Sequence, residues 1–131
     1  MQNAKSSKQN GKTQKFTDLH TWQYGHELVL SIYKATKNFP KEEVFSLTSQ
    51  MRRVAVSITS NIAEGFGRRS QKDKVHFYTM GQGSLTELQN QLIISQDINY
   101  LTNQEANAYL RQSETVHKLL TGLIKSIQGD K

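Results

Sequence analysis

Apolar side chains recur every three or four residues over most of the chain from Phe16 onward. This spacing is that of α-helices with one buried face, and it divides into four segments separated by short polar or glycine-containing stretches. The single proline, Pro40, argues against an all-β chain with frequent Pro/Gly turns and favours long uninterrupted helices. The pattern therefore predicts four helices.

The first two predicted helices flank Pro40. The first follows Asp18, an expected N-cap, and stops near Asn38, because the residue before a proline is pushed out of the helical region. The second runs from about Glu43 to Glu64 and ends at Gly65-Phe66-Gly67, where glycine can adopt the left-handed conformation that closes a helix. Their expected core faces contain Leu19, Trp22, Val29, Ile32, Tyr33 and Thr36, and then Leu47, Met51, Val54, Ala55, Ile58 and Ile62.

Capping signatures mark the starts of the other two helices. Ser70 stands three residues before Asp73, and Thr102 stands three before Glu105, which is the spacing of a capping box. The expected core faces contain Phe77, Tyr78, Gly81, Leu85, Leu88, Leu92, Ser95 and Ile98, and then Ala106, Tyr109, Leu110, Ser113, Val116, Leu120, Leu123, Ile124 and Ile127. Because short connections make consecutive helices antiparallel, we predict an all-α, antiparallel up-down-up-down four-helix bundle.

Charge is distributed unevenly along this chain of 131 residues, a length typical of one domain. The net charge of +6 invites a nucleic-acid interpretation. Residues 1–15, however, carry four lysines and no acid, whereas the remainder carries thirteen bases and eleven acids. Residues 1–16 are also nearly free of apolar side chains, so they are predicted to be a disordered basic tail, with the bundle at residues 17–131.

Several classes of protein do not fit the composition. The absence of cysteine excludes disulfides, Cys-ligated zinc and thiol catalysis, and no apolar run approaches the ~20 residues of a membrane span. Ser57, Ser60 and Ser84 lack the sequence context of a nucleophile, and Glu114 with His117 matches only half of a carboxylate-bridged metal motif. We therefore expect a cytoplasmic protein that is not an enzyme, with no catalytic residue, metal, cofactor or membrane partner.

A basic cluster surrounds the predicted corner between the second and third helices, where residues 52–74 hold six bases and two acids. The candidate nucleic-acid-binding residues are Arg68, Arg69, Lys72 and Lys74, together with Arg52 and Arg53. Antiparallel packing places the first four at one end of the bundle, whereas the other two lie further back along the second helix and need not join them. Ordinary solvated surface, with a Glu64–Arg68 pair, is the alternative to a polyanion site. Since only Phe66 and Phe77 flank the cluster, backbone contact is expected rather than base stacking.

Polar side chains also crowd the end of the second helix, among Ile58, Ile62 and Ala63. They are Ser57, Ser60, Asn61 and Glu64. Polar groups on or beside a core face must find partners, either within the chain or across a subunit interface. The small residues Gly81, Gly83 and Ser84 further allow closer helix contact than a lone bundle requires. Together these features suggest a homo-oligomer.

The stretch Ser57-Ile-Thr-Ser-Asn-Ile-Ala-Glu-Gly-Phe-Gly-Arg-Arg-Ser70 resembles the bacterial four-helix-bundle proteins named for intervening sequences in 23S ribosomal RNA genes. The resemblance covers roughly residues 18 to 125, except that Thr59 stands where the family commonly has proline. It implies a single bundle, often assembled into rings with pentamers favoured, and an association with RNA or the ribosome. The residues it marks as family motif or interface are Ser57, Ser60, Asn61, Glu64, Gly65, Phe66 and Gly67.

Two functions are consistent with these features. The first is a non-enzymatic, homo-oligomeric bundle that binds structured RNA, associated with ribosomal RNA or the ribosome, through its basic patch. The alternative is an oligomeric scaffold that docks a protein partner and has no specific nucleic-acid binding.

Overall fold

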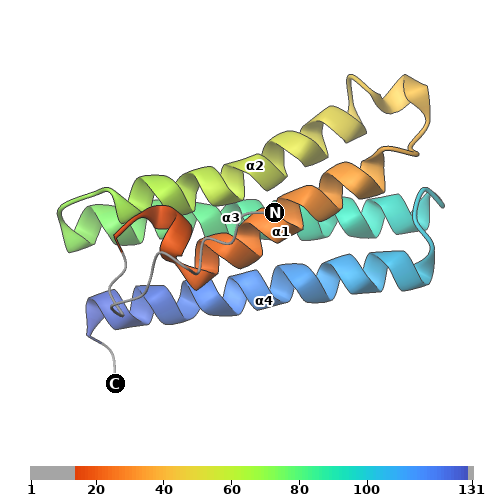
Figure 1. Ribbon diagram of the computed structural model, residues 1–131. Helices are drawn as coiled ribbons and strands as arrows, with labels where there is room; N and C mark the ends of the chain where they lie inside the picture. Colours follow the sequence, from red (N-terminus) through yellow and green to blue (C-terminus); the bar gives the residue numbers. More distant parts are fainter. Residues whose placement is uncertain (1–13, 130–131) are drawn as a thin grey trace.

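The computed structural model describes residues 14–129, all of whose regular structure is helical (Figure 1). A short 3-10 helix, η2 (Phe16–Asp18), precedes α1 (His20–Thr36), and a second, η3 (Lys41–Glu43), precedes α2 (Leu47–Phe66). The chain continues as α3 (Gln71–Asp97) and α4 (Asn103–Gln128). The predicted four-helix bundle is confirmed, and residues 1–13 of the predicted tail lie outside the described residues.

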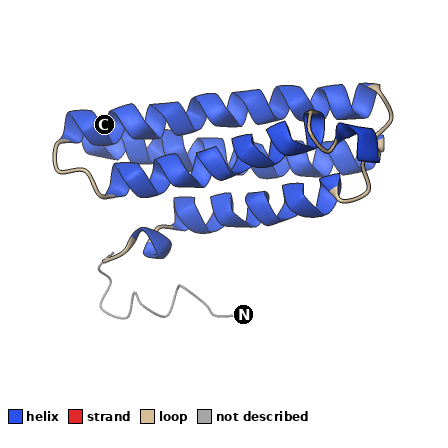
Figure 2. Ribbon diagram, turned by 90° about the horizontal axis from the view of Figure 1, so that it is seen from above, coloured by secondary structure: helices blue, strands red, loops and turns tan. Residues whose placement is uncertain are grey.

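Each helix packs against two neighbours, α1 and α3 both lying between α2 and α4 (Figures 1 and 2). The helices alternate in direction, as short connections require. One end of the bundle, here called the corner end, holds the α2–α3 connection at residues 67–70, the start of α1 and the end of α4 (Figure 1). The opposite end holds the α1–α2 and α3–α4 connections.

The core is formed by the apolar stripes of all four helices. Side chains with no exposed surface include Leu28, Ile32, Met51, Ala55, Ile58, Ile62, Leu85, Leu88, Leu92, Ala106, Val116 and Leu120. Burial of each larger side chain contributes about 1.5–3 kcal/mol. Two residues expected in the core are instead exposed: Tyr33, 42% exposed, lies at the edge of the α1 stripe, and Ile98, 45% exposed, follows the last residue of α3.

The predicted N-caps of α3 and α4 are present, but that of α1 is not. Ser70 Oγ accepts the N–H of Asp73 at 3.0 Å, and Thr102 and Glu105 form the predicted reciprocal capping box. The prediction that Asp18 caps α1 is wrong, because the N-cap is Leu19. Asp18 is fully buried in η2, where its Oδ2 accepts the backbone N–H groups of Gln14 and Lys15, both at 3.0 Å.

The predicted start of the second helix at Glu43 is also wrong. Residues Lys41–Glu43 form η3, and α2 begins only at Leu47, whose N–H is accepted by the Glu43 carboxylate at 3.3 Å. The other carboxylate oxygen accepts the Tyr100 hydroxyl at 2.7 Å and so ties the two connections at this end together. Hydrogen bonds from the Ser46 hydroxyl and then from Tyr100 lower the pKa of Glu43.

Gly65 and Gly67 do not end α2 in the left-handed conformation that the sequence suggested. The φ of Gly67 is −80°, within the right-handed region, and α2 continues through Gly65 to Phe66. Gly65 is instead a point of close approach between helices, since a Cβ there would lie 2.5 Å from the ring of Tyr78 in α3. Burial of that ring raises the pKa of the Tyr78 phenol to about 12.

Residues 14–129 contain no helix with both the length and the apolarity that a membrane span requires.

Replacement of Gly65 by Ala should lower the free energy of unfolding by about 1–3 kcal/mol, because the added methyl collides with Tyr78. The matched control is Gly83→Ala in α3, where a Cβ meets nothing within 4 Å. That change should raise the free energy of unfolding by about 0.5–1 kcal/mol through helix propensity alone. Urea unfolding measures both, and a Gly65→Ala protein as stable as the parent would contradict the packing described here.

Candidate nucleic-acid interface

The turn between α2 and α3 places four cations within seven residues at the corner end of the bundle. They are Arg68, Arg69, Lys72 and Lys74. The α2 helix ends at Phe66 and Ser70 is the N-cap of α3, so a short turn joins the two helices at this end (Figure 1). The corner that the sequence predicted is therefore present, but its four cations have different surroundings.

Arg68 is partly engaged within the chain. Its Nη2 donates to Glu64 Oε1 at 2.7 Å, which is the pair expected from the spacing of four residues. Its guanidinium also lies over the ring of Phe77, 4.4 Å from the centroid. Both members of the ion pair are exposed, so the pair adds about 0–1 kcal/mol and can be exchanged for an external anion.

Lys74 caps the end of α2. Its Nζ donates to the carbonyl oxygens of Phe66 and Gly65, at 2.7 and 3.3 Å, and lies 5.5 Å from the centroid of the Phe66 ring. A cation at this position satisfies carbonyl groups that the helix leaves without partners and opposes the negative end of its dipole. The main role of Lys74 in the structure is therefore to hold the corner.

Arg69 and Lys72 are the available cations of the corner. Both are exposed, and neither side chain makes a hydrogen bond or ion pair to any residue in the range 14–129. Asp73 is also exposed: its backbone N–H donates to the Ser70 hydroxyl as part of the cap, and its carboxylate adds one negative charge between Lys72 and Lys74. Phosphate groups approaching the corner would therefore meet Arg69 and Lys72 first, with Arg68 beside them.

Further positive charge lies at the same end of the bundle. Lys125 is exposed in the last turn of α4, and Lys15 directly precedes η2 at the start of the first helical segment (Figure 1). The other tail lysines, Lys5, Lys8 and Lys12, precede it in the sequence and lie outside the described residues. The basic tail therefore joins the bundle at the end that carries the basic corner.

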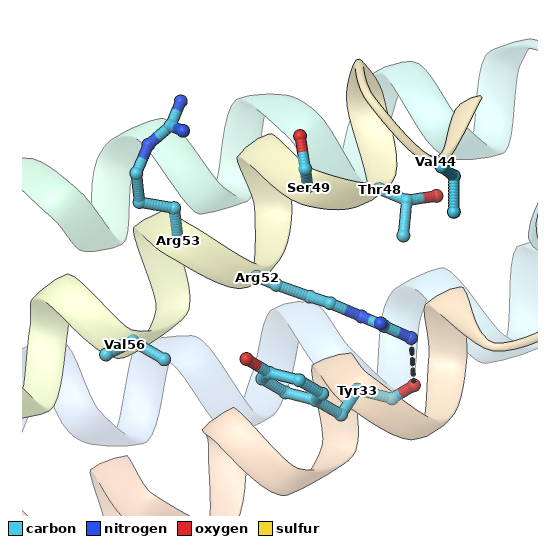
Figure 3. A pocket seen from close by; sticks show the side chains of 7 residues that line it. All are labelled: Tyr33, Val44, Thr48, Ser49, Arg52, Arg53 and Val56. Atoms are coloured by element: carbon cyan, nitrogen blue, oxygen red, sulfur yellow. Dashed lines mark hydrogen bonds between the residues drawn. The ribbon is translucent and has the colours of Figure 1, made fainter.

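Arg52 and Arg53 do not belong to this corner, because they lie in the second turn of α2, 14 and 13 residues before Phe66 respectively, or ~20 Å along the axis. Arg52 ties α2 to α1: its Nε donates to Thr36 Oγ1 at 2.9 Å and its Nη2 to the Tyr33 carbonyl at 3.3 Å (Figure 3). Its guanidinium lies 4.7 Å from the centroid of the Tyr33 ring. Arg53 extends away from α1 into solvent (Figure 3).

These two arginines help to line a surface groove of about 430 Å³, which was not predicted from the sequence. This α1–α2 groove is lined by Tyr33, Val44, Thr48, Ser49, Arg52, Arg53 and Val56 (Figure 3). The signal that could have revealed it is the apolar pair Val44-Phe45, which follows the charged residues Lys41–Glu43 shortly before α2.

The motif residues of α2 find most of their partners inside the chain. Asn61 is buried and donates to the Ser57 carbonyl at 2.9 Å and to Ser57 Oγ at 3.2 Å, while the Ser57 and Ser84 hydroxyls share a hydrogen bond of 3.0 Å. The expectation of a buried polar set is wrong for Ser60 and Glu64, which are exposed on the outer side of the helix.

Of the two glycines in α3 that were expected to allow close helix contact, only one packs against another helix. Gly81 permits close helix approach, since a Cβ there would lie 3.4 Å from Leu120, whereas Gly83 faces open space. The helix α2 also runs unbroken through Thr59, the residue that replaces the family's usual proline. Gly81 therefore serves packing within one bundle, whereas Gly83 does not.

The half-motif Glu114 and His117 lines a second shallow groove, of about 280 Å³, together with Gln89 and Lys118. Within residues 14–129, no three His, Asp or Glu side chains gather closely enough to hold a metal ion.

Replacement of Arg52 by Ala should lower the free energy of unfolding by about 1–2 kcal/mol, because two hydrogen bonds and the stacking on Tyr33 are lost. Arg69→Ala removes the same charge from an exposed site and should change stability by no more than about 0.5 kcal/mol. Thermal unfolding of the two variants tests this, and equal stabilities would show that Arg52 is not a clamp between α1 and α2.

Comparison with solved structures shows the same fold elsewhere. A crystal structure of a protein of unknown function from the S23 ribosomal protein family of Bacteroides thetaiotaomicron is 23% identical in sequence, with a TM-score of 0.72. The match covers 80% of this chain and 98% of that chain. A comparison with curated proteins found no match.

A family model gives the stronger relationship, because it matches the chain over nearly the whole bundle. The model is that of the 23S rRNA-intervening sequence protein, and the match spans residues 17–122, including the motif in α2, the basic corner and the Ser70 cap. This agrees with the resemblance noted from the motif alone. The chain belongs to the 23S rRNA-intervening sequence protein family.

Proposed function

We propose that this protein is a non-enzymatic, homo-oligomeric helical bundle that binds structured RNA in the cytoplasm through its corner end. The observation that carries the proposal is the pair of exposed cations, Arg69 and Lys72, which have no anionic partner among residues 14–129. Arg68 adds a third cation, held by an exposed ion pair that phosphate can displace. The names of the family and of its structural neighbour refer to ribosomal RNA and to a ribosomal protein, which favours RNA as the polyanion.

The chemistry of the corner favours contact with the phosphate backbone. Phe66 and Phe77 are only partly exposed, and each ring is already covered by a cation, Lys74 and Arg68 respectively. These two rings therefore offer little surface on which bases could stack, which is the usual means of holding single strands. Double-stranded RNA is recognised mostly by shape, phosphate and 2′-hydroxyl contacts, and these are what exposed arginine and lysine provide.

Assembly explains how so small a site can bind usefully. Two or three cations make few phosphate contacts, so one corner alone binds weakly. A homo-oligomer presents several corners together, and the second contact then becomes intramolecular, which raises the overall affinity without any new contact. The basic tail, which joins the bundle at the same end, adds further contacts that salt can screen.

Neutralising the two available cations should weaken RNA binding. The double variant Arg69→Ala/Lys72→Ala should bind a structured RNA about tenfold more weakly at low salt, and the slope of log K against log salt should fall by about two. The matched control is Lys34→Ala/Lys37→Ala, which removes the same charge from exposed sites towards the opposite end of α1. Fluorescence anisotropy over a range of salt concentrations measures both.

Deletion of residues 1–13 separates the tail from the folded corner. The shortened protein should bind RNA more weakly but remain sensitive to Arg69→Ala/Lys72→Ala. If the deletion abolishes all binding and the double variant alone changes nothing, the folded corner is not the binding site.

The assembly has its own test. Light scattering of the intact protein at micromolar concentration should give the mass of a closed homo-oligomer, with the pentamer favoured by the family resemblance. The mass of a single chain would contradict this part of the proposal.

A scaffold that docks another protein is the second candidate, and the observation that favours it is the 95% exposure of Phe45 beside the α1–α2 groove. A protein that acts only in this way would show no saturable RNA binding at near-physiological salt while its oligomer stayed intact.

A further inference from the structure

Phe45 is the most exposed large apolar side chain among the described residues. It lies between η3 and α2, with 95% of its surface exposed, while its neighbour Val44 turns into the α1–α2 groove (Figure 3). An exposed phenylalanine loses the stabilisation that burial of its ring supplies. Hydrogen bonds from Ser46, Leu47 and Tyr100 to the Glu43 carboxylate hold the connection that carries the ring.

The α1–α2 groove beside it has the properties of a receptor for such a ring. Its apolar part is formed by Tyr33, Val44 and Val56, which are 42%, 46% and 39% exposed. Arg52 is fixed over the Tyr33 ring by two hydrogen bonds, so a planar guanidinium and an aromatic ring are already positioned (Figure 3). A second aromatic ring entering the groove can pack on the valines and on these planar groups.

The positive charge beside the groove favours an occupant that carries negative charge. Arg52 and Arg53 border it, and their side chains diverge on either side (Figure 3). The segment that carries Phe45 has the opposite sign next to the ring, because Glu42 and Glu43 precede Val44 and Glu42 is exposed. The N-terminal tail is a poor occupant, since it is rich in lysine and nearly free of apolar residues.

The α2 motif that the sequence suggested as an interface is largely used within the chain. Ser57 bonds to Ser84, Asn61 bonds to Ser57, and Gly65 packs on Tyr78. The motif residues Ser60 and Glu64 remain exposed but are polar, so an apolar contact between copies needs another surface. Every copy carries both Phe45 and the α1–α2 groove, so each chain can insert its own phenylalanine into one neighbour and receive that of another, as a closed assembly of identical chains allows.

We propose that Phe45 of one copy inserts into the α1–α2 groove of a second copy, with Glu42 of the first facing Arg53 of the second. The inference rests on the homo-oligomeric assembly proposed above and specifies the surface that forms it. The contact lies towards the end of the bundle opposite the corner, so assembly leaves Arg69 and Lys72 exposed.

Sedimentation velocity over a range of protein concentrations tests the contact. Phe45→Ser should weaken self-association at least about tenfold, whereas Ile93→Ser, at a position 47% exposed on α3, should leave it unchanged. Arg53→Glu should also weaken association, and the charge-swapped Glu42→Arg/Arg53→Glu protein should recover it. Circular dichroism checks that each variant is folded.

The possible outcomes separate this inference from the proposed function. A parent protein that is monomeric throughout the concentration range overturns the homo-oligomer and this contact together. A parent oligomer that persists in Phe45→Ser, or that the charge swap fails to restore, overturns the contact alone and leaves the oligomer in place. If the groove instead serves a different protein, the parent and Phe45→Ser have equal masses, and that result counts against the inference.

Discussion

The contact of the Tyr78 ring with Gly65 is the constraint on which the corner end depends. It lets α3 start directly beside the last turn of α2, since a Cβ at Gly65 would lie 2.5 Å from that ring. Lys74 then reaches back to the carbonyls of Gly65 and Phe66 and locks the turn. Without this close approach, α2 would have to move away from α3 at this point.

The rigid turn also decides how the positive charge is used. Of the four corner cations, Lys74 caps α2, and Arg68 pairs with Glu64 and covers Phe77. The other two, Arg69 and Lys72, are exposed and have no anionic partner in the described part of the chain. A count of basic residues therefore overstates the site. The same logic applies at the far end, where Arg52 stabilises the contact between α1 and α2 while Arg53 remains available at the groove.

The bundle could be predicted from the sequence because the features that specify its helices are local. Helical periodicity, the Ser70 and Thr102 caps and the Glu64–Arg68 pair each involve residues only a few positions apart. Predictions that depended on contacts distant in the sequence were less successful. Gly65 was interpreted as a helix end, because nothing near it in the sequence reveals that Tyr78 occupies the space of its Cβ. Arg52 looked like part of a basic patch, because its partners, Thr36 and Tyr33, are 16 and 19 residues away. The groove escaped prediction for the same reason, since its walls come from two helices and a connection.

The central claim is that the folded corner, and not merely a basic tail, contacts RNA. Ultraviolet crosslinking of the protein in cells, followed by sequencing of the bound RNA and mass spectrometry of the crosslinked peptides, tests it most directly. The account predicts recovery of structured RNA with crosslinks in residues 67–74. Crosslinks confined to residues 1–15, or no enrichment of RNA over an uncrosslinked control, would contradict it.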